Sequence, residues 1–186
     1  YDADTLIGDD SANLFKIYTG SDYVDAGGGD DSVALFDPWL AHQDMTVLGG
    51  AGNDTITASG SLDGGDGNDS LSGHVGRDSL VGGDGADTLS GLFDADSLDG
   101  GAGDDILDGE EGDDSLFGGE DDDSLDGGAG ADTLYGGSGD DYLDSGAGTS
   151  GIESLDGGAG ADTLSGAILG GAFAADGDVG ADLLDF

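Results

Sequence analysis

A nine-residue repeat constrains the fold of this chain more than any other feature of its sequence. From residue 64 to residue 144 the nonapeptide occurs nine times without interruption, and the first three units read GGDGNDSLS, GHVGRDSLV and GGDGADTLS. Every unit has Gly at its first position, Asp at its sixth and Leu at its eighth. A short fixed period of this kind indicates a solenoid, in which each repeat stacks on its neighbours. We therefore expect a single domain over residues 1–186, with a regular block at residues 64–144.

Each unit divides into a six-residue turn and a three-residue strand. In a strand, the middle residue points to one side and its neighbours to the other, so Leu should face the interior and the seventh and ninth residues the solvent. If two units form one coil, every second unit lies directly above its predecessor. The expected fold is all-β: a right-handed parallel β-roll (a β-helix or solenoid) with two short-stranded parallel sheets and a column of turns along each edge.

The repeat is interrupted on both sides of the regular block. Residues 35–48 span fourteen positions and contain the only Pro and Trp, so we expect a loop insertion there. This loop is either a tolerated surface insertion or a partner-contact loop built on Trp39. Irregular C-terminal coils occupy residues 145–186, with Glu153 near the sixth position and an apolar unit at residues 166–176. Neither residues 35–48 nor residues 166–176 have a carboxylate in the sixth-position register. No metal ion should therefore bind between either segment and the coils next to it. Ile168, Leu169 and Phe173 should instead fill the interior or cover an edge.

The charge of the chain requires a counter-ion. There are 43 Asp and Glu residues against 2 Lys and Arg, and the formal net charge is -41. Such a chain repels itself, and it disfavours nucleic acid and anionic membranes as partners. It has no Cys and no apolar run long enough for a membrane span. One reliably buried residue in nine cannot offset the cost of ordering a glycine-rich backbone, so without bound cations the chain should be disordered.

The composition of the turns favours calcium. Glycine-rich turns expose backbone carbonyl oxygens, and the Asp at the sixth position adds a carboxylate that points the same way. Calcium takes six to eight oxygen ligands at flexible geometry, whereas magnesium requires a tighter octahedron and keeps its waters. Zinc would need His or Cys, and His42 and His74 are far apart in sequence. The number of turns predicts roughly 7–14 calcium ions.

These repeats resemble the RTX (repeats-in-toxin, hemolysin-type) family of calcium-binding nonapeptide repeats, and the resemblance covers nearly the whole chain. Members share a calcium-filled parallel β-roll, which typically forms part of larger bacterial proteins exported by a one-step secretion apparatus. The resemblance implies a secreted, extracellular or cell-surface location. It also implies that the sixth-position carboxylates are ligands along two edges. Edge I carries Asp69, Asp87, Asp105, Asp123 and Asp141, and edge II carries Asp78, Asp96, Asp114 and Asp132.

Outside the regular block, the same reasoning gives Asp22, Asp31, Asp54, Asp162 and Asp182 as further ligands. The carbonyl groups implied to complete the sites belong to Gly64, Asp66, Gly82, Gly83, Asp84, Gly85, Gly100, Gly101, Gly103, Gly118, Gly119, Gly127, Gly128, Gly130, Gly136, Gly137 and Gly139.

Several turns depart from the pattern. In edge II, His74, Leu92 and Glu110 occupy the second position in three successive turns, where edge I has Gly throughout the block. Asp94 and Asp121 replace the Gly at the fourth position. We expect strained turns or weaker calcium binding at these places. We interpret His74 and Arg77, which share one turn, as surface residues and not as catalytic groups.

The sequence favours a non-catalytic, calcium-responsive folding and spacer module. Nothing singles out a catalytic constellation, although a carboxylate pair for glycoside chemistry stays open among so many acids. An alternative is a protomer of a fibre, surface layer or adhesin. It would associate end to end, because Tyr1 and Phe186 both interrupt a repeat, or laterally through outward Phe117 and Tyr135, expected one above the other. A weaker alternative is ice binding. The hydroxyl ladder for it is Ser79, Ser97, Ser115 and Thr133.

Overall fold

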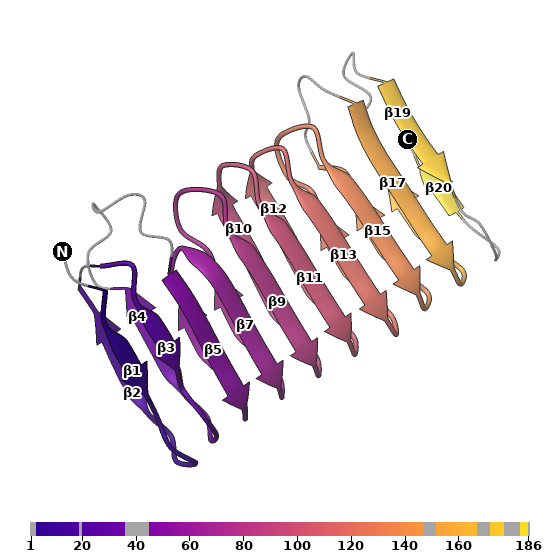
Figure 1. Cartoon of the computed structure of the whole chain (residues 1–186). Helices are drawn as coiled ribbons and strands as arrows, with labels where there is room; N and C mark the ends of the chain where they lie inside the picture. Colours follow the sequence, from indigo (N-terminus) through magenta and orange to yellow (C-terminus); the bar gives the residue numbers. More distant parts are fainter. Residues whose placement is uncertain are drawn as a thin grey trace.

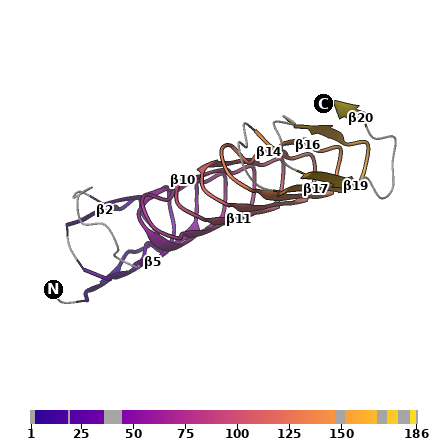
Figure 2. The ribbon, with the colours of Figure 1, turned by 90° about the horizontal axis from the view of Figure 1, so that it is seen from above.

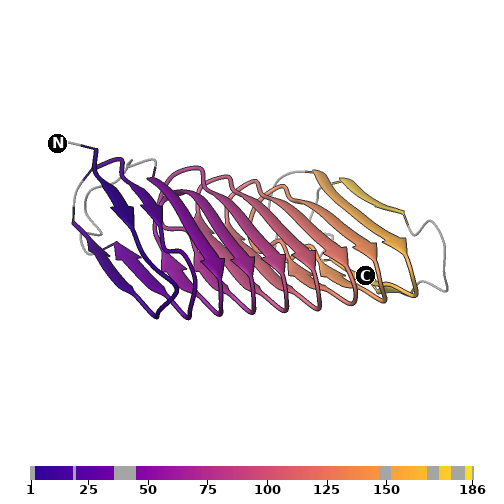
Figure 3. The ribbon, with the colours of Figure 1, turned by 60° about the horizontal axis from the view of Figure 1, so that its bottom comes forward.

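A parallel β-solenoid of two sheets makes up the described part of the chain (Figure 1). The computed structural model describes residues 3–18, 20–35, 45–146, 152–166, 172–176 and 183–185. The odd-numbered strands β1 to β19 form one ten-stranded sheet and the even-numbered strands β2 to β20 form the other, each in sequence order. Each coil thus contributes one strand to each sheet. Seen from above and from below, the two sheets are the two walls of one elongated stack (Figures 2 and 3).

The strands of the first sheet are β1 (Thr5–Ile7), β3 (Tyr23–Asp25), β5 (Met45–Ala51), β7 (Gly60–Asp66), β9 (Ser79–Asp84), β11 (Ser97–Ala102), β13 (Ser115–Glu120), β15 (Thr133–Ser138), β17 (Ile152–Ala159) and β19 (Ala172–Asp176). Those of the second sheet are β2 (Leu14–Ile17), β4 (Ser32–Leu35), β6 (Thr55–Thr57), β8 (Ser70–Ser72), β10 (Thr88–Phe93), β12 (Ile106–Glu111), β14 (Ser124–Asp126), β16 (Tyr142–Asp144), β18 (Thr163–Ser165) and β20 (Leu183–Asp185). The described residues include no helix that is long and apolar enough to cross a membrane.

The pairing register confirms that two repeats form one coil. In the first sheet Leu80 aligns with Leu98 and Leu98 with Leu116, and the same eighteen-residue step relates Leu89 to Leu107 in the second sheet. The eighth-position side chains of both sheets meet in one apolar column, as predicted. Its fully buried members in the regular block are Leu71, Leu80, Leu89, Leu98, Leu107, Leu116, Leu125, Leu134 and Leu143.

The strands of the first sheet are longer than the three residues that the sequence predicted. From β5 to β17 they have six to eight residues, because the first turn residues continue the hydrogen-bonded ladder. Gly101, for example, still aligns with Gly119, and Ala102 with Glu120. In the second sheet only β10 and β12 extend in this way, to six residues each. Part of each edge I turn is therefore stacked as regularly as the strands themselves.

Two predicted irregularities can be followed only in part. Trp39 and the rest of residues 36–44 lie outside the described residues, as do Ile168 and Leu169. The chain enters β5 at Met45, which aligns with Gly60 and so occupies the sixth-position register without a carboxylate. The backbone of Phe173 aligns with that of Glu153, which places both in the same register.

Candidate metal centre

The sixth-position aspartates line the two edges of the solenoid, as the repeat predicted. Edge I turns lead from the first sheet to the second, and edge II turns lead back. Although Asp is usually exposed, each of these side chains is at most 4 % exposed. The buried aspartates are Asp22, Asp31, Asp54, Asp69, Asp78, Asp87, Asp96, Asp105, Asp114, Asp123, Asp132, Asp141 and Asp162. Asp182 lies outside the described residues.

One carboxylate oxygen of each aspartate ties neighbouring coils together. In edge I the backbone N–H of Asp69 donates to Oδ1 of Asp87 at 2.7 Å, and that of Asp87 donates to Oδ1 of Asp105 at 2.7 Å. In edge II the N–H of Asp96 donates to Oδ1 of Asp114 at 2.7 Å. The sixth-position side chain thus accepts a structural hydrogen bond from the coil before it. The repeat pattern predicted metal binding for this carboxylate and gave no sign of the hydrogen bond.

The second carboxylate oxygen is buried and accepts no hydrogen bond in most of these turns. A buried charged oxygen without a partner is costly, and a cation is the partner that would compensate it. In edge I this describes Oδ2 of Asp31, Asp54, Asp69, Asp87, Asp105, Asp123 and Asp141. In edge II it describes Oδ2 of Asp96 and Asp114.

Apart from that of Asp31, whose turn begins at Ala26, each of these oxygens faces a cradle that only glycine leaves open. A Cβ atom built on Gly100 would collide with Oδ2 of Asp105 and would lie 2.7 Å from the carbonyl oxygen of Gly118 in the next coil. Gly64 stands in the same relation to Asp69 and to the carbonyl oxygen of Gly82, at 2.7 Å. A carboxylate oxygen and a carbonyl oxygen therefore border the same small space, as a hard cation requires.

The donor set fits calcium. Among the described residues, no group of three or more His, Cys, Asp or Glu side chains converges on one point. A metal ion between two turns would therefore be held by single carboxylates together with backbone carbonyls. Such all-oxygen surroundings suit calcium, whereas zinc would need nitrogen or sulfur ligands.

The predicted carbonyl groups are not equivalent. The carbonyl oxygens of Gly83 and Gly85 point toward the glycines at the same positions in the next coil, Gly101 and Gly103. The carbonyl oxygen of Asp84 instead accepts a hydrogen bond from the N–H of Gly67 at 2.7 Å, and Asp66 accepts one from Gly52 at 2.7 Å. These third-position carbonyls already support the ladder. Their predicted role as ligands stays a prediction.

Burial raises the pKa of eight of these aspartates: Asp54, Asp69, Asp87, Asp96, Asp105, Asp114, Asp123 and Asp141. Nearby carboxylates, such as Asp87 and Asp54 beside Asp69, raise the pKa further. Hydrogen bonds from backbone N–H groups act in the opposite direction. The pKa rises to about 6 for Asp69, Asp105, Asp114 and Asp141, and to about 7 for Asp96 and Asp123. Without a bound cation, the folded turns therefore disfavour their own ionised carboxylates.

Four of the five non-glycine residues that depart from the turn pattern adopt left-handed backbone conformations. Leu92 has φ 75°, Asp94 71°, Glu110 67° and Asp121 75°. These values lie near the left-handed α region, which non-glycine residues reach at moderate cost. His74 does not share this conformation.

A second ladder at the fifth position of edge I was not predicted. The N–H of Asn68 donates to Oδ1 of Asn53 at 2.8 Å, and the N–H of Asp140 donates to Oδ1 of Asp122 at 2.7 Å. The signal was present in the sequence, since Asn or Asp occupies the fifth position in most edge I units. This exposed ladder reinforces the turns without taking part in the buried cradle.

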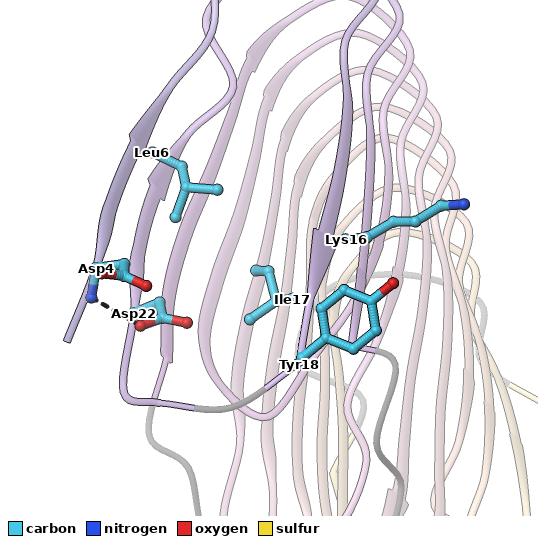
Figure 4. A pocket seen from close by; sticks show the side chains of 6 residues that line it. All are labelled: Asp4, Leu6, Lys16, Ile17, Tyr18 and Asp22. Atoms are coloured by element: carbon cyan, nitrogen blue, oxygen red, sulfur yellow. Dashed lines mark hydrogen bonds between the residues drawn. The ribbon is translucent and has the colours of Figure 1, made fainter. Parts of the chain in front are cut away.

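The first coils contain the least regular part of the site. The N–H of Asp4 donates to Oδ1 of Asp22 at 2.8 Å, beside a cavity of about 190 Å³ (Figure 4). Leu6 and Ile17 extend into this cavity from opposite sheets, and Lys16 and Tyr18 lie at its margin. In the short turn that follows residue 57, Gly60 occupies the sixth-position register, because it aligns with Met45 and precedes the paired Ser61 and Ser79.

Comparison with known proteins identifies the repeat. A family model described as RTX calcium-binding nonapeptide repeat (4 copies) matches residues 46–63, 59–89, 81–116, 90–125, 117–149 and 147–167. The matched segments overlap and cover well over half of the chain, including the whole regular block. A comparison with curated proteins gave no match.

Proposed function

Because this chain belongs to the family of RTX calcium-binding nonapeptide repeat proteins, we propose that it is a calcium-responsive structural module of a secreted protein. It folds when calcium fills the turns and then acts as a rigid spacer without catalytic activity. The observation that supports this role best is the column of buried aspartate Oδ2 atoms that accept no hydrogen bond. Such columns require a ligand that repeats along the whole solenoid.

Calcium binding and folding form one equilibrium in this proposal. The cradles exist only when successive turns are stacked, so the unfolded chain has no preformed site. In the folded chain without calcium, buried like charges would face each other along each edge. A site with a Kd on the order of 10⁻⁴–10⁻³ M, as in extracellular calcium modules, contributes about 4–5 kcal/mol at a 1 M standard state. Many such sites supply the stabilisation that one buried Leu per repeat does not.

The proposed location outside the cell follows from the same affinity. Sites of this strength stay empty at the low calcium concentrations that cytosolic sensors detect, and they fill only where calcium is abundant. The net charge of -41 keeps the ion-free chain unfolded and soluble.

A calcium titration tests the proposal. Far-UV circular dichroism should show coil in chelator and sheet in millimolar calcium, and magnesium at the same concentration should not replace calcium. Sheet that persists in chelator would contradict calcium-dependent folding. A midpoint in the submicromolar range would contradict filling outside the cell, because the sites would then be occupied in the cytosol as well.

A self-associating surface protein is the second candidate, and one observation favours it. Phe117 and Tyr135 stack on the outer face of the first sheet with ring centroids 5.2 Å apart, and they are 41 % and 40 % exposed. Exposed aromatic side chains are frequent at protein interfaces. In sedimentation velocity, a mass that rises with concentration and falls in Phe117→Ser would support this candidate. A concentration-independent monomer would exclude it. The hydroxyl ladder Ser79, Ser97, Ser115 and Thr133 is in register, but no observation favours ice binding.

A further inference from the structure

The turn at residues 73–78 differs from the other edge II turns of the regular block in how its carboxylate is used. Oδ1 of Asp78 accepts a hydrogen bond from the N–H of Gly60 at 2.6 Å. Its Oδ2 accepts another from the N–H of His74 at 2.9 Å, within the same turn. In the next two turns of this edge, Oδ2 of Asp96 and Oδ2 of Asp114 are buried and have no such donor. Both oxygens of Asp78 are therefore engaged by backbone N–H groups.

The backbone of this turn is also stacked only in part on the neighbouring turns. Pairing between β8 and β10 stops at Ser72 and Ser90, whereas between β10 and β12 it continues into the turn, where Leu92 aligns with Glu110. A Cβ atom built on Gly76 would meet nothing within 4 Å. At Gly112, the fourth position of a later edge II turn, it would collide with the carbonyl oxygen of Asp94. Gly76 therefore lacks contact with the short turn that precedes it. Toward the following coil, the first position keeps the usual contact, since a Cβ atom on Gly73 would lie 2.7 Å from the carbonyl oxygen of Gly91. What distinguishes this turn is the lost pairing at its second position and the hydrogen bond that occupies Oδ2 of Asp78.

Donors occupy the place where a calcium site needs acceptors. The N–H of Gly76 donates to Oδ2 of Asp94 at 3.0 Å, and the N–H of Asp78 donates to Oδ1 of Asp96 at 2.7 Å. The bond from the Asp78 N–H belongs to the Oδ1 ladder that all these turns share, so the two donors that distinguish this turn are the N–H groups of His74 and Gly76. Backbone N–H groups repel a cation, so these hydrogen bonds compete with calcium for the same carboxylate oxygens.

The two preceding coils of edge II lack a ligand as well. Met45 and Gly60 occupy the sixth-position register there, and Met45 is 1 % exposed. The turn at residues 73–78 also contains Arg77, one of only two Lys and Arg residues in the chain. A positive side chain beside a turn further disfavours a divalent cation.

We propose that edge II carries no calcium ion over the coils of Met45, Gly60 and Asp78, where backbone hydrogen bonds and apolar packing replace it. The calcium column of edge II then begins between the turns of Asp96 and Asp114. Edge I is filled continuously alongside, from Asp54 to Asp141. This assignment rests on the proposed calcium-dependent function, and it removes Asp78 from the ligands that the repeat pattern implied. Calcium thus holds the coils at residues 45–90 along one edge only.

Anomalous diffraction from calcium-loaded crystals of the full chain tests the assignment directly. We expect peaks in edge I beside Asp69, Asp87 and Asp105 and in edge II between the turns of Asp96 and Asp114. We expect none between residues 73–78 and 91–96. A peak in that space would overturn the inference while leaving the proposed function intact. The absence of peaks from both edges would remove the proposed function and this inference with it.

Ion counting by native mass spectrometry provides a second test in solution. Asp78→Asn should bind as many calcium ions as the wild type, whereas Asp96→Asn should lose at least one. An equal loss in both variants would overturn the inference. The double variant H74G/R77N, whose turn reads GGVGND like the glycine-rich turns of edge I, decides the question if Asp78→Asn does not fold. One additional ion in it supports an empty wild-type turn, and an unchanged count means that the turn was already filled.

Discussion

Edge I and edge II place the same carboxylate at the same register but use different backbone conformations to do so. At the second turn position, Gly83 and Gly101 of edge I have φ 118° and 109°, whereas Leu92 and Glu110 of edge II have φ 75° and 67°. The edge I values lie outside the left-handed α region and are accessible to glycine only, whereas the edge II values are tolerated by other residues. At the second turn position of the regular block, backbone conformation therefore requires glycine in edge I and only favours it in edge II.

This difference explains where the repeat diverges. Substitutions at the second position accumulate in edge II at His74, Leu92 and Glu110. Leu92 and Glu110 keep the turn stacked, because their left-handed conformation preserves the ladder from β10 to β12. His74 does not adopt it, and its turn closes on itself through hydrogen bonds. Loss of a glycine in edge II can therefore either keep the turn stacked or leave its carboxylate hydrogen-bonded within its own turn.

Removing a carboxylate from edge I, which we propose is filled with calcium throughout, should have the largest effect. Asp105→Asn replaces the partnerless Oδ2 and weakens the Oδ1 acceptor of the Asp87 N–H, so the cradles on both sides of the turn are damaged. We expect a loss of about 3 kcal/mol of calcium-dependent stability, the upper range for interactions of charged groups. The calcium midpoint should rise accordingly in a titration followed by circular dichroism.

Asp99→Asn is the matched control, since it removes the same charge from the exposed outer face of β11. It should leave the midpoint nearly unchanged. If both variants shift the midpoint equally, calcium responds to the total charge of the chain and not to the edges.

The backbone difference between the edges predicts the next largest effect. Gly101→Ala would force a side chain into φ 109° and against the carbonyl oxygen of Gly83, which should cost about 1–3 kcal/mol. Glu110→Gly, at the same position of edge II, removes the strain of a left-handed glutamate and should change stability by no more than about 1 kcal/mol. Calcium-loaded thermal unfolding measures both. Equal destabilisation by the two variants would refute the distinction between the edges.

Sequence reasoning could establish the repeat, the coil length, the apolar column and the buried aspartates, because one period encodes all of them. The difference between the edges was only partly accessible. His74, Leu92 and Glu110 were visible as departures, but the sequence does not reveal that Leu92 and Glu110 keep the turn stacked whereas His74 does not. Whether a turn stays stacked depends on the φ angle of its second residue and on hydrogen bonds between coils. One such bond is donated by the N–H of Gly76 to the carboxylate of Asp94. The hydrogen bond that Oδ1 of each aspartate accepts from the preceding coil could not be predicted either, since the residue type does not show which of its two carboxylate oxygens is engaged.

Acidification should weaken calcium binding at both edges. In the folded chain without calcium, the pKa of Asp105 rises from 3.8 to about 6 and that of Asp96 to about 7. Between these values and 3.8 the folded state binds more protons than the unfolded state, so the ion-free fold loses stability as pH rises. In the unfolded chain that prevails without calcium the carboxylates ionise near pH 3.8, so the calcium midpoint should change little from pH 8 to 6. It should rise as pH falls from 6 toward 4, because calcium needs the deprotonated carboxylates.

Calcium titrations at several pH values measure this dependence. It should become weaker in Asp105→Asn and stay nearly unchanged in Glu110→Gly, which removes an exposed carboxylate outside the sixth-position column. A midpoint independent of pH would mean that the buried carboxylates are not the groups that bind calcium.

The smallest effect is expected away from both edges, at the stacked pair on the outer face of the first sheet. Phe117 and Tyr135 are ninth-position residues in neighbouring strands, and their rings are 5.2 Å apart with an interplanar angle of 5°. Phe117→Ser should cost about 0.5–1.5 kcal/mol from the lost aromatic pair, without changing the number of bound calcium ions. Val81→Ser, at the same repeat position and 36 % exposed, is the control for the loss of an apolar surface group.

Thermal unfolding in saturating calcium measures the stability of these variants, and native mass spectrometry counts the calcium ions that they bind. If Phe117→Ser lost calcium ions, the outer face of the sheet would be coupled to the turns, and edge conformation alone could not account for binding. If stability falls while the ion count stays constant, the sheets contribute to stability independently of the edges, and calcium acts through the turns alone.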